Sequence, residues 1–267
     1  DSLNTRKGKI IGFSVSGEIG KGYYMPTMEF KDDQLQEIIV DGKPAHTLAK
    51  YAIGKLIGKK LVTHNGSFDG RMTKNFYGID LIPYIHIDTG LLVHTVKEEG
   101  AFGFGSPFGL KSIAKMIKKE LGLDGDEEAN QEQIELKESI KRNGGSTSKD
   151  NYEIFKADLD TLAKYAAADA DLTLRIYNHF ITVLKEEDLE KFFFEDEVMP
   201  LYREVTILME DHGVKLNISL IEKIKNSITA DLDKYADLVV NELLQDTKVR
   251  GWIIDKAVEA YPPLRKH

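Results

Sequence analysis

The sequence predicts an α/β domain followed by an all-helical segment. Short apolar strands alternate with helical patterns through most of the chain, and this alternation is typical of an α/β core. Beyond residue 187 the apolar residues recur at helical spacing, and the boundary between the two parts is expected near Glu187. The 267 residues suffice for one large domain or two smaller ones.

The first elements expected are two paired strands and a helix. Residues 9–16 and 23–30 have strand composition, and a glycine-bounded turn over residues 17–22 separates them. Residues 45–57 place Leu48, Tyr51, Ala52, Leu56 and Ile57 at helical spacing.

Two strand-to-helix units follow. Residues 61–65 form a short strand that leads into a helix beginning near Ser67 or Phe68. Residues 85–89 form another strand, which leads into a helix through residues 92–96. In α/β sheets, functional sites gather where strands end, so both junctions are candidate positions for a site.

The second half of the chain is mostly helical. Helices are expected at residues 110–121, 158–185, 192–211 and 217–244, with Gly213 as a helix C-terminal cap. Residues 122–151 are polar, with an acidic cluster and a Gly/Ser/Thr stretch, and predict an exposed insertion with at most one helix.

Composition excludes several functions. The chain has no cysteine, which excludes disulfides and cysteine nucleophiles and fits a reducing cytosol. No apolar run approaches the roughly 20 residues of a membrane span. The start is not a signal peptide and has no Met, so it is expected to be trimmed. A net charge of −8 argues against nucleic-acid binding, except where bound metal ions face the phosphates.

Two groups of residues are candidates for chemistry. Asp69 stands in the first turn of a helix that follows a strand, where an isolated Asp often only complements the helix dipole. Tyr165 and Asp169 lie one turn apart on one helix face, and the three alanines between them leave room for close approach. Alone, that second pair is typical of a half-buried Tyr beside a solvated Asp.

Together these groups form one pattern: Asn65-x-x-x-Asp69 after a strand, Asp88-Thr89 at a strand end, and Tyr165-x-x-x-Asp169 on a late helix. The pattern resembles the 3′→5′ exonuclease domain of family A DNA polymerases of the Klenow type. Those domains belong to the ribonuclease H-like exonucleases that use four acidic residues and a tyrosine (the DEDDy class). The resemblance implies that the missing Asp-x-Glu motif lies just upstream of residue 1.

The tail resembles the same family. Residues 199–201 (Met-Pro-Leu) and 213–216 (Gly-Val-Lys-Leu) are similar to the helix and extended step that open the polymerase region. The resemblance thus assigns residues 1–187 to the exonuclease domain and residues 188–267 to the helical start of the polymerase and thumb region. Residues 122–151 depart from it, because they are longer than in the Klenow type.

The resemblance implies hydrolysis with two Mg²⁺ or Mn²⁺ ions, which prefer carboxylate ligands. Asp69 and Asp169 would bind the metals with the upstream Asp and Glu. Tyr165 would orient the attacking water, since a phenol with a pKa near 10 is a poor base at neutral pH.

Further residues are expected near the DNA. Leu3 would pack against the terminal base, or else belong to the core, and Asn65 would lie near the 3′-terminal nucleotide. His64 would contact substrate or be a hydrogen-bonded structural residue, and Asp88 is expected to cap a helix. The loop side chains Phe102, Phe104 and Phe108 would stack on bases or anchor their loop to the core.

The implied partners are DNA, as a single-stranded 3′ end and as primer-template, and possible replication accessory proteins. The implied location is the cytoplasm of a bacterial cell or phage-infected host. Two alternatives stay open: an RNase D-like exoribonuclease, and a catalytically silent exonuclease fold that serves as a platform in a polymerase. Without the upstream motif, this stretch of chain is expected to be inactive by itself.

Overall fold

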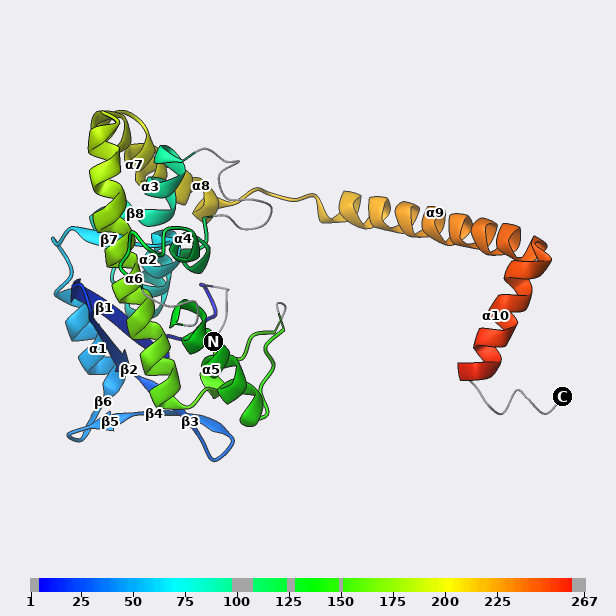
Figure 1. The fold of residues 1–267 in the computed structure, drawn as a ribbon, viewed down its shortest axis with the longest axis horizontal. Helices are drawn as coiled ribbons and strands as arrows, with labels where there is room; N and C mark the ends of the chain where they lie inside the picture. The colour runs from blue at the N-terminus through cyan, green and yellow to red at the C-terminus, as the bar shows by residue number, and fades with distance from the viewer. Residues whose placement is uncertain (1–4, 98–107, 124–127, 149–150, 261–267) are drawn as a thin grey trace. The chain divides into compact units, whose positions relative to one another are not determined.

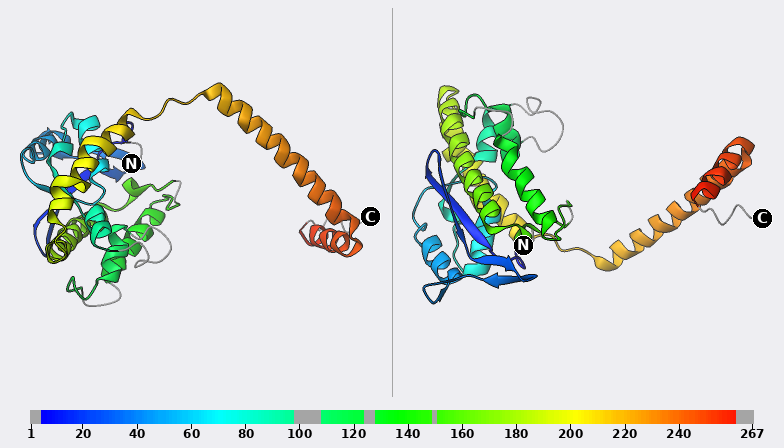
Figure 2. Two further views of the ribbon diagram at one scale, coloured as in Figure 1. Left: turned by 90° about the horizontal axis from the view of Figure 1, so that it is seen from above. Right: turned by 60° about the horizontal axis from the view of Figure 1, so that its bottom comes forward.

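The computed structural model describes residues 5–97, 108–123, 128–148 and 151–260 (Figures 1 and 2). The chain divides into two compact units, Asp1–Asp211 and His212–His267. Unit 1 mixes strands and helices, and the described part of unit 2 is helical, which confirms the predicted α/β class and the helical segment. Over the described residues the strands pair two by two, so a ribonuclease H-like sheet stays a prediction.

The first strand pair is confirmed, but its second strand is shorter than expected. Strand β1 (Gly12–Glu18) pairs antiparallel with β2 (Lys21–Pro26). The chain then bends at Thr27, whose backbone N–H donates to Ile11 O at 2.8 Å and whose hydroxyl donates to Ile10 O at 2.7 Å. The rest of the expected strand therefore turns away as β3 (Met28–Lys31).

Two small hairpins were not expected. Strand β3 pairs with β4 (Gln34–Glu37), and β5 (Ile39–Val40) pairs with β6 (Lys43–Pro44). Each has a two-residue turn with positive φ at both positions, which is the geometry that matches strand twist in tight hairpins. These angles are 51° and 59° at Asp32 and Asp33, and 48° and 74° at Asp41 and Gly42.

The two strand-to-helix units are confirmed. Strand β7 (Leu61–Thr63) pairs parallel with β8 (Ile85–Asp88). Helix α2 (Gly66–Tyr77) follows β7, and helix α3 (Thr89–Val96) follows β8. Because the strands are parallel, the starts of both helices lie at the same edge of the pair. The helix expected at residues 45–57 is α1 (Ala45–Gly54), and the short helix η1 (Ile82–Tyr84) precedes β8.

Helix α6 (Leu159–Glu186) is the long central helix of unit 1 (Figure 1). It packs against β1, β2 and α3, and also against α4 (Leu110–Met116) and α5 (Glu128–Arg142). A Cβ added to Gly22 would lie 2.1 Å from Ala167 O, so β2 occupies the space that the alanines leave. Short helix η3 (Ile154–Lys156) precedes α6.

The region 122–151 is less exposed than expected. Its helix α5 buries Leu136 and Ile140 against Leu162 of α6, and Tyr165 packs at the edge of this cluster. The region therefore contributes to the core beside Tyr165.

Residues 188–211 are helical but irregular. They form η4 (Phe192–Asp196), α7 (Val198–Pro200), η5 (Leu201–Thr206) and α8 (Ile207–His212), of which η4 and η5 have π-helical geometry. Pro200 has no N–H to donate to the carbonyl four residues earlier, which disturbs a regular helix here. Phe193, Met199 and Ile207 are buried in the main core with Ile176 and Phe180 of α6.

Compact unit 1 therefore extends to Asp211, whereas the boundary near Glu187 was predicted between an exonuclease domain and a polymerase region. That functional division stays a prediction. Gly213 has a φ of 66° and follows α8, as expected of a C-terminal cap.

Unit 2 contains α9 (Ile218–Gln245) and a further helix that was not expected, α10 (Thr247–Ala260). Asn217 caps α9, since its side chain accepts from Leu220 N at 3.1 Å. Among the described residues, no helix combines the length and apolarity needed to span a membrane.

The close approach of β2 to α6 generates the first prediction. Gly22→Ala should lower the free energy of unfolding by about 1–3 kcal/mol, because the new methyl group overpacks against the Ala167 carbonyl. Gly17→Ala is the control, since a Cβ there meets nothing within 4 Å. Urea denaturation of both variants measures the difference. Equal losses would contradict the packing argument.

Candidate functional site

Strands β7 and β8 end at the same edge of their parallel pair, which is called the strand edge below. Asp88 ends β8 at this edge and is buried, with 3% of its surface exposed. Its Oδ1 accepts from Gly90 N at 3.0 Å, which caps α3 as predicted. Its Oδ2 accepts from Gly66 N at 2.7 Å, the first N–H of α2. One carboxylate therefore satisfies the N-termini of two helices.

The turn between β7 and α2 is tight. Asn65 adopts the left-handed conformation, with φ 63° and ψ 46°, which Asn tolerates better than most residues. A Cβ on Gly66 would lie 2.2 Å from Thr63 Oγ1, so this position requires glycine. The Asn65 side chain is exposed and accepts from Ser67 Oγ at 3.4 Å. The turn places Asp69 in the first turn of α2.

The Asp69 side chain is exposed to water, but protein atoms crowd around it and partly desolvate its carboxyl group. Desolvation by that surrounding protein, and secondarily the negative charge of Asp88, raise the pKa of the Asp69 carboxyl to about 7. The water that reaches the side chain moderates the desolvation. A cation placed beside Asp69 would favour its ionised form.

His64 joins the strand edge to the neighbouring elements. Its Nδ1 lies 2.8 Å from Thr89 Oγ1, and its ring also bonds to the backbone of Phe108. Burial lowers the pKa of His64, against the opposing influence of Asp88 and Asp169. The ring is thus held by hydrogen bonds and lies within the electrostatic reach of both carboxylates.

Tyr165 and Asp169 lie on α6 and share contacts with Lys111 of α4, a residue that the sequence did not single out. Lys111 Nζ lies 2.5 Å from Asp169 Oδ1 and 5.2 Å from the centre of the Tyr165 ring. The Tyr165 hydroxyl donates to Asp169. Burial first, and then Asp169, raise the pKa of Tyr165 far above its usual value. Tyr165 is therefore protonated at neutral pH.

The donor set fits a divalent cation in part. Asp169 Oδ1 is buried and, apart from the Lys111 ammonium, receives no hydrogen bond, so it has a lone pair to give. Asp69 is accessible to a ligand. Over the described residues, however, no three His, Asp or Glu side chains cluster closely enough to hold a metal.

The predicted site residues differ in what surrounds them. Asp69 and His64 both interact electrostatically with Asp88, and His64 interacts also with Asp169. The convergence of Asp69 and Asp169 on one site stays a prediction. Leu3, Phe102 and Phe104 lie outside the described residues. Phe108 packs against the main core and lies 4.7 Å, centre to centre, from the His94 ring.

Tyr202 is a second residue that the sequence did not single out. Its hydroxyl accepts from Ser67 N at 2.8 Å and donates to Asp88 Oδ2 at 3.3 Å. Burial raises the pKa of Tyr202 to about 12, so the hydroxyl keeps its proton for Asp88. Tyr202 lies 114 residues from Asp88 in the sequence, so no local pattern predicts that the two side chains meet.

Known proteins similar to this chain are DNA polymerases, although no family model matches it. The chain is 27% identical over 221 residues to DNA polymerase I of Borreliella burgdorferi, covering 81% of this chain and 20% of that protein. It is 26% identical over 261 residues to the DNA polymerase of Escherichia phage T5, covering 92% of this chain and 27% of that protein. It is 22% identical over 238 residues to the DNA polymerase of Bacillus phage SP01, covering 86% of this chain and 22% of that protein.

The chain therefore spans between 20% and 27% of the length of these curated relatives. The matches support a relationship to DNA polymerases at low identity.

The environment of Asp69 generates a pH prediction. The folded protein holds the Asp69 proton more tightly than the unfolded chain does. Protonated Asp69 therefore stabilises the fold fully below about pH 4, and this stabilisation is lost as the pH rises through about 7. Asn mimics the protonated form. In chelator-treated buffer, Asp69→Asn should raise the free energy of unfolding by about 1 kcal/mol at about pH 8, after allowance for solvent, and leave it unchanged at about pH 4. Urea unfolding at both pH values tests this, and a pH-independent difference would contradict it.

Proposed function

We propose that this chain forms the proofreading 3′→5′ exonuclease part of a family A DNA polymerase, followed by the helical start of its polymerase region. The observation that carries the proposal is the buried Asp169 carboxylate beside the Tyr165 hydroxyl, whose Oδ1 has the Lys111 ammonium as its partner. The similarity to DNA polymerases over 81–92% of the chain supports it. The reaction is hydrolysis of the 3′-terminal phosphodiester of DNA.

The chemistry requires divalent cations. Two Mg²⁺ or Mn²⁺ ions, when bound, would activate the attacking water and stabilise the oxygens on both sides of the reacting phosphorus. Asp69 and Asp169 would hold them, together with the Asp-x-Glu pair expected upstream.

Tyr165 contributes a hydrogen bond rather than a base. Its raised pKa keeps the phenol protonated, so its hydroxyl positions the water and does not remove a proton from it. Helix α5 and Lys111 pack around its ring and hold it in place.

The substrate side of the proposal involves Asn65, His64 and Leu3. Asn65 is exposed at the start of α2, where its amide can reach the 3′-terminal nucleotide. His64 acts through the elements that it joins, since both of its ring contacts are with the protein. The setting is the cytoplasm of a bacterial cell or phage-infected host, with DNA as substrate.

One observation favours a silent exonuclease fold as a second candidate. Lys111 already neutralises Asp169, as a cationic side chain would in a site that no longer binds metal. The two candidates differ in their response to Mg²⁺.

The central test uses the longest natural form of the protein, with any upstream Asp-x-Glu included, on a single strand of DNA. It should degrade the strand from the 3′ end only with Mg²⁺ or Mn²⁺, and labels on the 5′ end report the shortening products. Asp169→Ala and Asp69→Ala should each slow digestion by more than the roughly 10–100-fold that loss of an outer partner of a metal ligand costs.

Asp160→Asn is the matched control, because Asp160 is an exposed acid on the same helix as Asp169. It should digest at the wild-type rate. Metal-independent digestion, or none by the wild type, would contradict the proposal. Parallel digestion of an RNA strand distinguishes the RNase D-like alternative.

Lys111→Met generates a separate prediction. The change keeps the length of the side chain and removes the cation, so Asp169 is left with an uncompensated charge. In chelator, the free energy of unfolding should fall by about 1–3 kcal/mol. Added Mg²⁺ should restore more stability to the variant than to the wild type, measured as a shift in Tm. A variant that does not respond to Mg²⁺ would favour the silent fold.

A further inference from the structure

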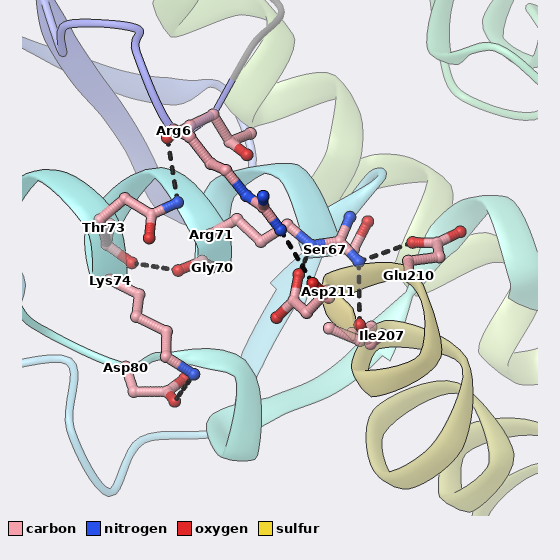
Figure 3. A network of polar contacts seen from close by, with 12 residues as sticks. Arg6, Ser67, Gly70, Arg71, Thr73, Lys74, Asp80, Ile207, Glu210 and Asp211 are labelled. Atoms are coloured by element: carbon pink, nitrogen blue, oxygen red, sulfur yellow. Dashed lines mark hydrogen bonds and ion pairs between the residues drawn. The ribbon is translucent and has the colours of Figure 1, made fainter. Parts of the chain in front are cut away.

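Three segments that are distant in the sequence meet at the end of α8 (Figure 3). Arg71 of α2 reaches this end, with Nε 2.6 Å from Asp211 Oδ1 and Nη2 2.6 Å from Glu210 Oε2. The same Nη2 donates to Ile207 O at 3.1 Å. Arg71 thus uses its planar fork to hold two carboxylates and a carbonyl, which a lysine could not do equally well.

The N-terminal segment joins the same cluster. Arg6 Nη2 donates to the backbone oxygen of Asp211 at 2.8 Å, and Asn75 Nδ2 of α2 donates to Thr5 O at 3.0 Å. Asp211 therefore bridges α2, through its side chain, and residues 5–6, through its backbone.

The same C-terminal segment also holds the start of α2. Tyr202 accepts from Ser67 N and donates to Asp88, as described above. Ser67 and Arg71 stand two residues before and two residues after Asp69. Residues 201–211 thus fasten α2 on both sides of the proposed metal ligand.

These contacts differ from an ordinary surface ion pair. The Arg71 side chain is 17% exposed, and its acceptors all belong to α8: the Ile207 carbonyl, Asp211 (33% exposed) and Glu210 (56% exposed). Lys74 of α2 and Asp80, which follows the helix, by contrast form an ion pair with 46% and 41% of their side chains exposed. Exposed pairs contribute little because water screens them, whereas a half-buried, forked arrangement fixes geometry.

We propose that residues 201–211 form a brace that positions Asp69 by holding α2 to residues 5–6 and to the Asp88 carboxylate. Arg71, Asp211 and Tyr202 are its positioning residues. The brace rests on the proposed function in one respect, because what it positions is a site for metal and DNA.

The test compares Tyr202→Phe, Arg71→Met and Asp211→Asn with the control Lys74→Met, in the longest natural form of the protein. Hydrogen exchange in metal-free buffer reports the brace directly. Tyr202→Phe keeps the ring but removes the acceptor for Ser67 N–H, so exchange at Ser67 should accelerate. Arg71→Met should accelerate exchange along α2, and Lys74→Met should leave both rates unchanged.

Metal and kinetic measurements then test the consequence. Binding of Mn²⁺ alone, followed by electron paramagnetic resonance, should weaken about 10–100-fold in the brace variants and stay at the wild-type value in Lys74→Met. The kcat for digestion of a single strand should fall, while KM for DNA changes little, because the brace does not contact substrate. Arg71→Lys should recover only part of the loss.

The outcomes separate the two proposals. If exchange accelerates as expected but the wild type neither binds Mn²⁺ nor digests DNA, the brace stands as structure and the nuclease function fails. If the wild type binds Mn²⁺ and digests DNA, while Tyr202→Phe and Asp211→Asn match Lys74→Met in exchange and Mn²⁺ affinity, the brace is wrong. Those two conservative changes decide the matter even if Arg71→Met does not fold.

Discussion

The buried carboxylate of Asp88 is the interaction on which the strand edge depends. A buried charge is costly unless hydrogen bonds satisfy it, and Asp88 receives them from Gly66 N, Gly90 N and Tyr202 Oη. Thr63 Oγ1 lies a further 3.5 Å from Oδ2. Both backbone donors belong to helix N-termini, whose dipoles also favour a negative charge. The starts of α2 and α3 and the segment around Tyr202 are therefore fixed to one another through a single side chain.

This arrangement divides the carboxylates at the edge by what their oxygens can still bind. Both Asp88 oxygens are already engaged, so this residue is suited to holding structure. Asp69 is reached by water, and the buried Oδ1 of Asp169 is contacted by the Lys111 ammonium. A metal ion needs available lone pairs, which Asp69 offers directly and Asp169 offers when the Lys111 ammonium moves away. Asp69 and Asp169 are thus the better candidates for ligands on local chemistry alone.

The sequence predicted the features that depend on near neighbours. The β1–β2 pair, the two strand-to-helix junctions and the Asp88 cap each follow from residues a few positions apart. The hairpin at Asp41-Gly42 also has a local signal, because an Asp-Gly pair is typical of a two-residue turn. In contrast, Lys111, Tyr202 and Arg71 act across 58 to 140 residues of separation, and ordinary lysine, tyrosine and arginine give no sign of such partners. The alanines of α6 predicted a close approach, but only the fold shows that β2 makes it.

The protein compensates for crowded carboxylates at this edge in two different ways. Desolvation first, and then Asp88, raise the pKa of Asp69, whereas Asp169 pairs with the Lys111 ammonium. A proton and an ammonium are both weaker substitutes for a divalent ion, because each neutralises one carboxylate and bridges none. A divalent cation bound at Asp169 would replace the Lys111 ammonium as the counter-charge of this carboxylate. The pairing with Lys111 is therefore compatible with an active site as well as with a silent one, and the direction of the Mg²⁺ response separates them.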